Sequence, residues 1–102
     1  MEIKVSADYM AFPVWNANHG MFDVEEAKEF LSGTLIADLI KWNENYDRNC
    51  YDYDETHPMY GRFDVSSHDI KGMELAKRVK LENPNARVKY FSEAKTEWIL
   101  IE

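Results

Sequence analysis

The sequence of 102 residues has few of the residues that mark a disulfide scaffold, a membrane anchor or a nucleotide-binding loop. Its single cysteine, Cys50, excludes an internal disulfide and favours a reducing compartment, so we expect a cytoplasmic protein. No apolar run approaches the roughly 20 residues that span a bilayer. The first ten residues lack the basic and then apolar pattern of a secretory signal. The four glycines stand singly, which excludes a glycine loop that cradles phosphate.

Residues able to carry catalysis or bind a metal are few and poorly spaced. Cys50, Asp54 and His57 lie close together in the sequence, but their spacing matches no zinc-ligand pattern. The acidic residues around Cys50 disfavour a reactive thiolate. His68, near the start of a predicted helix beside Asp69, is expected to be exposed. We therefore predict no enzymatic activity, no catalytic residue, no cofactor and no metal site.

Basic residues are outnumbered, with 12 Lys and Arg against 19 Asp and Glu, and the formal net charge is -7. Residues 1–43 carry seven acids and three bases, and residues 44–70 carry seven acids and two bases. Residues 71–102 are basic instead, with five acids and seven bases. The acidic field disfavours direct nucleic-acid binding and would attract a basic protein surface. Alternatively, the acidic charge serves only to keep a small protein soluble.

The hydrophobic content of 45%, with no repeat or Gly/Ser linker, predicts a single folded domain over residues 1–102. Alternation of apolar and polar residues predicts strands at residues 2–7, 87–91 and 98–101, with a further short strand at Val14 and Trp15. The polar connection at residues 92–97 predicts an antiparallel hairpin between the last two strands.

Two long helices are predicted. Ser32 is a candidate N-cap for the first, whose apolar positions Leu35, Leu39, Trp42 and Tyr46 recur at helical spacing. The second begins at Ser66 or Ser67 and runs to Leu81, before the Asn83-Pro84 stop. Its predicted apolar positions are Ile70, Met73, Leu75, Ala76 and Val79.

The order of these elements predicts an α+β fold in two layers. We expect a small, mostly antiparallel sheet of three to four strands, with the two long helices packed on one face. Trp15, Trp42 and Trp98 are expected in the core rather than at a functional site.

The tract from Asn43 to Tyr60, NENYDRNCYDYDETHPMY, holds four of the six tyrosines and follows the first long helix. Tyrosine offers a large contact area with a polar tip and is enriched at interfaces, and carboxylates attract a basic partner. The tract therefore predicts a partner-binding surface. A solvated loop, or packing of the tract over the core, is the alternative. The predicted contact residues are Asp47, Tyr51, Asp52, Tyr53, Asp54 and Glu55.

Short motifs along nearly the whole chain resemble a family of small acidic bacterial proteins. They are AspTyr at 8–9, PheProValTrp at 12–15, Gly20, Asp23, LeuSer at 31–32, the helix with Leu35, Leu39, Trp42 and TyrAsp at 46–47, Gly72, LeuAla at 75–76, ValLysTyrPheSerGlu at 88–93 and Trp98. Proteins of this kind resemble the immunity proteins encoded beside polymorphic toxins, including those of contact-dependent growth inhibition. The resemblance implies a binding protein without activity of its own, and it transfers no catalytic residue.

The sequence and the resemblance together favour an immunity protein that neutralises a cognate toxin domain. We expect a basic toxin, a nuclease, bound by a monomer in a 1:1 complex, with no direct nucleic-acid or membrane binding. The alternative is a non-enzymatic regulatory or adaptor domain that binds another basic protein or a small ligand. A small enzyme would instead require a deep pocket in which polar groups of shifted pKa converge.

Overall fold

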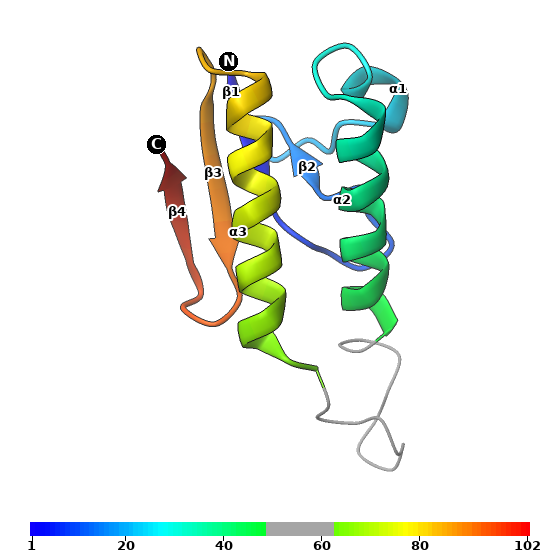
Figure 1. Cartoon of the computed structure of the whole chain (residues 1–102), viewed down its shortest axis with the longest axis vertical. Coiled ribbons are helices and arrows are strands. Elements are labelled where there is room, and N and C mark those ends of the chain that lie inside the picture. The colour runs from blue at the N-terminus through cyan, green and yellow to red at the C-terminus, as the bar shows by residue number, and fades with distance from the viewer. Residues whose placement is uncertain (49–62) are drawn as a thin grey trace.

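The computed structural model describes residues 1–48 and 63–102, and the elements follow one another as Figure 1 labels them. They are β1 (Glu2–Val5), β2 (Val14–Trp15), α1 (Val24–Ala27), α2 (Gly33–Tyr46), α3 (Val65–Glu82), β3 (Arg87–Ser92) and β4 (Glu97–Ile101). The fold is α+β, with two long helices, as the sequence predicted. None of the helices in this part of the chain is long and apolar enough to cross a membrane.

The sheet has the strand order β2-β1-β3-β4 and is mixed. The two outer pairs, β1 with β2 and β3 with β4, are antiparallel. The central pair, β1 with β3, is parallel. The prediction of a mostly antiparallel sheet was therefore wrong. Both long helices lie between β1 and β3 in the sequence, and a connection of this length allows the chain to return in the same direction, as a parallel pair requires. The predicted β3–β4 hairpin is confirmed, with Phe91 opposite Trp98.

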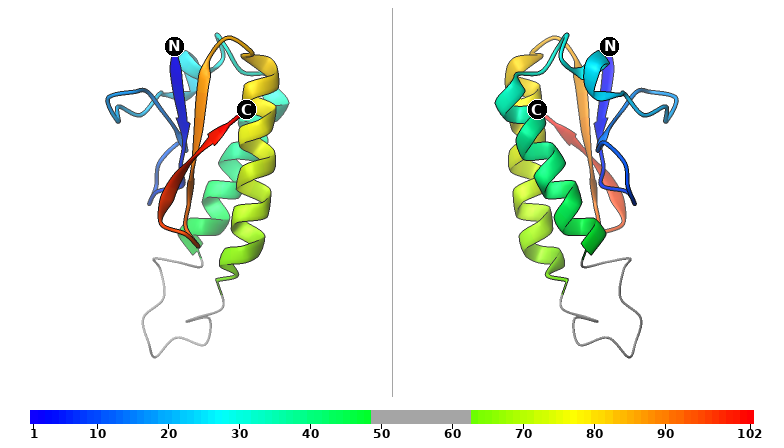
Figure 2. Two further views of the ribbon diagram at one scale, coloured as in Figure 1. Left: turned by 90° about the vertical axis from the view of Figure 1, so that its left-hand side faces the viewer. Right: turned by 90° about the vertical axis from the view of Figure 1, so that its right-hand side faces the viewer.

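The two long helices begin at capping residues. Ser32 caps α2 as predicted, since its Oγ accepts a hydrogen bond from the Leu35 amide at 3.3 Å. α3 begins one or two residues earlier than predicted, because Asp64 caps it by accepting from the Ser67 amide at 3.1 Å. Figure 2 shows both helices on the same side of the sheet. An ion pair joins them, with 2.6 Å between Arg78 and Asp38.

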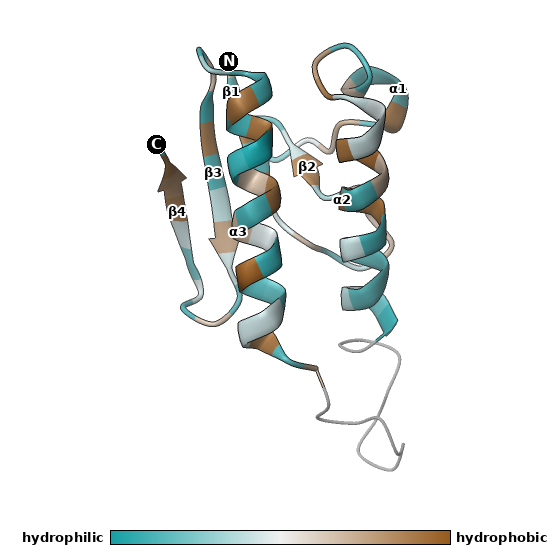
Figure 3. Ribbon diagram, viewed as in Figure 1, coloured by the Kyte–Doolittle hydropathy of each residue, from teal (hydrophilic) through white to brown (hydrophobic). Residues whose placement is uncertain are grey.

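Apolar residues of both layers form one core. Figure 3 shows hydrophobic and hydrophilic residues alternating around α2 and α3, as expected for helices buried on one side. Leu35, Leu39, Trp42 and Tyr46 are all buried, which confirms the predicted face of α2. The other buried apolar side chains include Ile3, Val5, Val14, Leu75, Val79, Val88 and Tyr90.

The contact between α3 and β3 depends on Gly72. This glycine is buried on α3, and a Cβ built on it would overlap the Tyr90 ring. Tyr90 is fully buried on β3. The absence of a side chain at Gly72 thus lets a large aromatic ring lie directly against the helix backbone.

We expect Gly72→Ala to lower the free energy of unfolding by about 1–3 kcal/mol, because overpacking outweighs the gain in helix propensity. Gly33→Ala is the matched control, since no atom of the described residues lies within 4 Å of a Cβ at that helical position. Gly33→Ala should be neutral or stabilise the protein by up to about 1 kcal/mol. Urea titrations of the two variants measure both effects. Equal stability changes would contradict the packing role of Gly72.

The face of the sheet away from the long helices carries aromatic side chains. Trp98 lies there with 37% of its surface exposed, so its predicted place in the core was wrong. It contacts Phe91 edge-to-face at 5.2 Å between ring centroids, and His19 at 5.7 Å. Lys4 lies 5.3 Å from the centroid of the same ring. No long helix of the described residues covers this face, so Trp98 packs against these neighbouring side chains instead.

Candidate functional site

The structure describes only the beginning of the tract that was predicted to bind a partner. Of the predicted contact residues, Asp47 lies at the end of α2 and is partly exposed. Tyr51, Asp52, Tyr53, Asp54 and Glu55 lie outside the described residues, as do Cys50 and His57. One of the four tyrosines of the tract, Tyr46, is buried in the core.

The last turns of α2 hold the loop at residues 8–11. The buried Asn43 accepts a hydrogen bond from the Asp8 amide and donates one to the Asp8 carbonyl, both at 3.0 Å. Asp47 Oδ1 accepts from the Met10 amide at 2.9 Å. Asp47 therefore positions the loop as well as carrying charge. The loop presents two large side chains to the surface, since Tyr9 is 51% and Met10 78% exposed.

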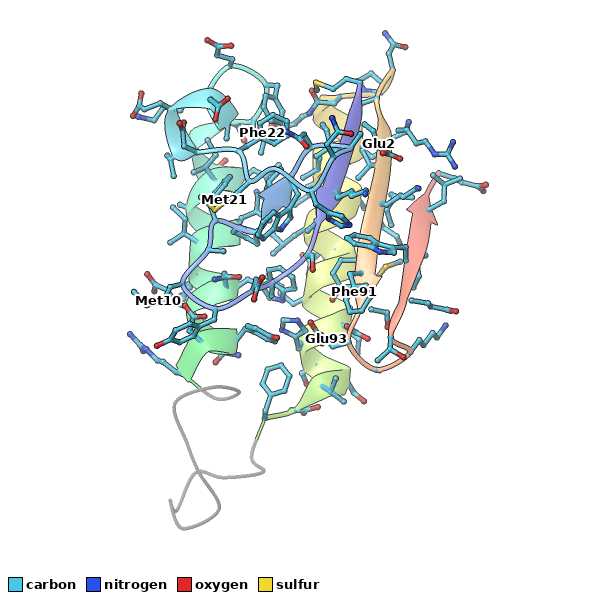
Figure 4. All side chains as sticks on the ribbon, turned by 180° about the vertical axis from the view of Figure 1, so that it is seen from behind. Glu2, Met10, Met21, Phe22, Phe91 and Glu93 are labelled. Carbon is cyan, nitrogen blue, oxygen red and sulfur yellow. The ribbon has the colours of Figure 1, made fainter. Side chains whose placement is uncertain are left out.

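Acidic side chains from four segments gather where α2 ends and α3 begins, an area we call the acidic end. Figure 4 shows Met10 beside the end of α2 and Glu93 at the turn between β3 and β4, in the same part of the molecule. The segments are residues 8–10, 44–48, 63–69 and 93–96, and only Arg48 and Lys95 are basic. The acidic residues are Asp8, Glu44, Asp47, Asp64, Asp69 and Glu93.

The negative charges of the acidic end affect the pKa of Glu93. Burial raises the pKa of the Glu93 carboxyl, and the negative charges of Asp69 and Asp8 raise it further. The two neighbours belong to α3 and to the loop after β1, so segments distant in sequence place their charges close together. A partner that brings positive charge to this end would relieve that repulsion.

Asp69 anchors the β3–β4 turn to α3. Its two carboxylate oxygens accept four hydrogen bonds, from Tyr90 Oη at 2.8 Å, Ser92 Oγ at 2.6 Å, and the amides of Glu93 and Ala94 at 3.1 Å each. Burial alone would raise the pKa of Asp69, but these hydrogen bonds outweigh it and lower the pKa below its ordinary value. The sequence analysis did not identify this role, because the donors lie more than 20 residues away along the chain.

A groove of about 550 Å³ opens between α2 and α3 beside the acidic end. Trp42, Phe63 and His68 supply its aromatic lining. The polar residues that border it are Asp38, Lys41, Asn45, Asp64, Ser67 and Lys71. The groove is large enough for a side chain or a small ligand.

His68 was expected to be exposed, and this was wrong: it is 3% exposed. The buried face of α3 consists of His68, Gly72, Leu75, Ala76 and Val79, whereas Ile70, predicted to lie on that face, is 71% exposed. Leu75, Ala76 and Val79 are buried as predicted, but Ile70 was misassigned because histidine and glycine were not counted as core residues. The His68 ring stacks on Trp42 at 4.5 Å between centroids, with 15° between the planes.

Among the described residues, neither ring nitrogen of His68 has a hydrogen-bond partner. Burial lowers the pKa of His68 to about 4, partly offset by the charge of Asp69. The imidazole is therefore neutral at pH 7. Across residues 1–48 and 63–102 no nucleophile is hydrogen-bonded to His68. Those residues also contain no group of three His, Cys, Asp or Glu able to hold a metal ion.

The low pKa of His68 makes stability depend on pH. In the unfolded chain histidine binds a proton below about pH 6.5. The folded protein binds it only near pH 4, so stability is full above pH 6.5 and is lost as the pH falls toward 4. We expect a loss of about 2 kcal/mol between pH 7 and pH 5 from this residue. His68→Phe, which keeps the ring stack, should lose most of that dependence in urea titrations at the two pH values. An unchanged dependence in the variant would refute this assignment.

The structure is a small α+β fold whose acidic end is a candidate binding surface. Residues 1–93 match a family model described as Serratia CdiI immunity protein-like, and the chain belongs to this family. The comparison with curated proteins gave no match. The family is that of immunity proteins of contact-dependent growth inhibition, which was suspected from the sequence and is now confirmed. Membership indicates neutralisation of a cognate toxin by protein–protein interaction, and it implies an inhibitor without enzymatic activity.

Proposed function

We propose that the chain neutralises a nuclease toxin by covering a cationic surface of the toxin with the acidic end. The observation that carries this proposal is the gathering of six acidic side chains against two basic ones where α2 ends and α3 begins. The predicted contact residues Asp47, Asp52, Asp54 and Glu55 follow directly from the same helix end. Nucleases hold nucleic acid in positively charged clefts, and carboxylates placed there substitute for phosphates.

Charge at the acidic end would mainly set the rate of association. An immunity protein must capture the toxin before the toxin acts, and complementary charge raises association rates well above those of neutral surfaces. The raised pKa of Glu93 supports this role: burial raises it most, and the nearby negative charges of Asp69 and Asp8 raise it further. A cationic toxin supplies compensating positive charge on binding.

Slow dissociation requires buried contact area in addition to charge. Tyr51 and Tyr53 are the predicted aromatic anchors, and the exposed Tyr9 and Met10 lie beside the start of the tract. Large aromatic and methionine side chains contribute disproportionately to interface energetics. The proposed contact surface therefore combines an acidic area with a few large side chains.

The proposed complex forms in the cytoplasm, with one toxin domain per chain and no direct contact with nucleic acid or membrane. To test it, the chain is mixed with the toxin domain encoded beside it, and binding and nuclease activity are measured in parallel. We expect stoichiometric binding and loss of nuclease activity at one equivalent. A toxin domain that stays unbound, or one of another activity, would overturn the proposal. Capture of a different basic protein instead would favour the adaptor alternative.

A further inference from the structure

β4 forms an open edge of the sheet. In the strand order β2-β1-β3-β4 it pairs with β3 on one side, and no described strand lies on its other side. Such an edge presents unpaired backbone amides and carbonyls to another strand, and proteins usually protect it with a charge, a proline or a bulge. The only charged residue of β4 is Glu97 at its start; residues 98–101, Trp-Ile-Leu-Ile, contain neither a charge nor a proline.

Both faces of this edge are apolar. Trp98 and Leu100, which are 37% and 47% exposed, lie on the sheet face away from the long helices. Ile99 borders a hollow of about 510 Å³ between α3 and β4, together with Met73 and the 71% exposed Ile70. Figure 3 shows hydrophobic colour over the last part of β4. The edge thus offers side-chain contacts on each face as well as backbone hydrogen bonds.

The charges around β4 suit a second copy of this chain better than a basic partner. Four basic and three acidic residues line the two hollows that flank the strand, which makes the area nearly neutral. Two chains that each carry a charge of -7 repel one another, and they approach at least cost where the local charge is balanced. A basic toxin is instead attracted to the acidic end. The charged lining residues are Asp69, Glu74, Lys77, Lys80, Lys95, Arg87 and Glu102.

The order of residues in β4 is self-complementary. If two copies pair in antiparallel fashion about a two-fold axis at Ile99, Ile99 lies opposite Ile99 of the other copy. Trp98 of each copy then lies opposite Leu100 of the other, so apolar side chains meet on both faces at residues 98–100, and Glu97 lies opposite Ile101 at the two ends of the pairing. We propose that β4 pairs with β4 of a second copy in this register, which continues the sheet across a two-fold homodimer.

This pairing uses none of the six predicted toxin-contact residues, although Asp69 and Lys95 of the acidic end also line the hollow beside β4. Each chain of the dimer keeps its own acidic end, and a complex with toxin becomes 2:2. The dimer therefore replaces the monomer expected from sequence while leaving one toxin domain per chain. Closed two-fold symmetry also covers both β4 edges at once, so neither β4 edge is left open for further addition.

Sedimentation equilibrium over a concentration series tests the dimer without toxin. We expect the unmodified chain to dimerise, and Leu100→Lys to raise the dimer dissociation constant about tenfold or more, because a charge interrupts the apolar edge. Leu81→Lys is the matched control: Leu81 is an exposed leucine (78%) on α3 that borders neither hollow. It should dimerise like the unmodified chain. A chain that stays monomeric throughout, or a dimer insensitive to Leu100→Lys, overturns the proposal.

A disulfide tests the register. Directly opposite residues in an antiparallel pair lie about 4.5–5.5 Å apart at Cα, within the span that a disulfide bridges. In a Cys50→Ser background, Ile99→Cys should oxidise to a covalent dimer. Glu97→Cys should not, because residue 97 then lies opposite residue 101. Cross-linking at residue 97 but not at residue 99 would contradict the proposed register.

Discussion

Reversing the charge of two predicted contact residues, Asp52→Lys together with Asp54→Lys, is expected to weaken toxin binding by about 100-fold. The two lysines replace an attraction to the cationic toxin surface with a repulsion. Most of the loss in the association rate should disappear at high salt, since exposed charges are screened over about 10 Å at 0.1 M ionic strength. Surface plasmon resonance with the cognate toxin domain gives both rate constants.

The matched control for this experiment is Glu25→Lys with Glu29→Lys. It changes the net charge by the same amount at exposed positions in and just after α1, at the opposite end of the molecule from the acidic end. It removes only an exposed contact of Glu25 with Lys28, and pairs of this kind contribute little to stability. Asp47 is left unchanged in both variants because it holds the Met10 amide. Equal losses of affinity in the two variants would show that total charge, rather than the acidic end, governs binding.

Asp69→Asn is expected to lower the free energy of unfolding by about 3 kcal/mol. Asparagine has nearly the same shape, but its NH₂ group cannot accept the hydrogen bonds that one carboxylate oxygen receives. Two donors share each oxygen: Tyr90 and the Glu93 amide donate to Oδ1, and Ser92 and the Ala94 amide donate to Oδ2. Whichever oxygen becomes NH₂, one buried hydroxyl and one amide lose their acceptor or meet another donor. Urea titration at pH 7 measures the loss.

A double-mutant cycle with Tyr90→Phe separates the anchoring role of Asp69 from a general effect on α3. Tyr90→Phe removes one donor and keeps the ring against Gly72. If the Tyr90–Asp69 hydrogen bond stabilises the fold, the double variant should lose less stability than the two single variants added together. Strict additivity would contradict that coupling. A loss below about 1 kcal/mol for Asp69→Asn would contradict the anchor itself.

Local patterns in the sequence were sufficient to predict α2 and the β3–β4 hairpin. Ser32 provides the cap of α2, and four residues from Leu35 to Tyr46 provide its buried face, so each observation depends on neighbours within a few turns. The hairpin likewise connects strands that are adjacent in sequence. Hydrophobic spacing and capping residues alone are therefore enough to predict such elements.

The parallel pairing of β1 and β3, and the burial of His68, could not be read from local pattern. Both depend on how the long helices pack after they form. His68 is buried because its ring packs against Trp42 and Phe63. Trp42 lies on α2, and Phe63 lies just before α3. The acidic end has the same origin, because Asp8, Asp69 and Glu93 become neighbours only when the tertiary structure brings three segments together.

The salt dependence of the association rate with the cognate toxin domain tests the central claim most directly. If the acidic end steers a cationic toxin, the association rate constant should fall about tenfold or more between low and physiological ionic strength. The dissociation rate should change much less. The Asp52→Lys and Asp54→Lys variant should lose most of this dependence, and the Glu25→Lys and Glu29→Lys variant should retain most of it. An association rate that is independent of salt in the unmodified chain would contradict the claim that the acidic end recognises the toxin by charge.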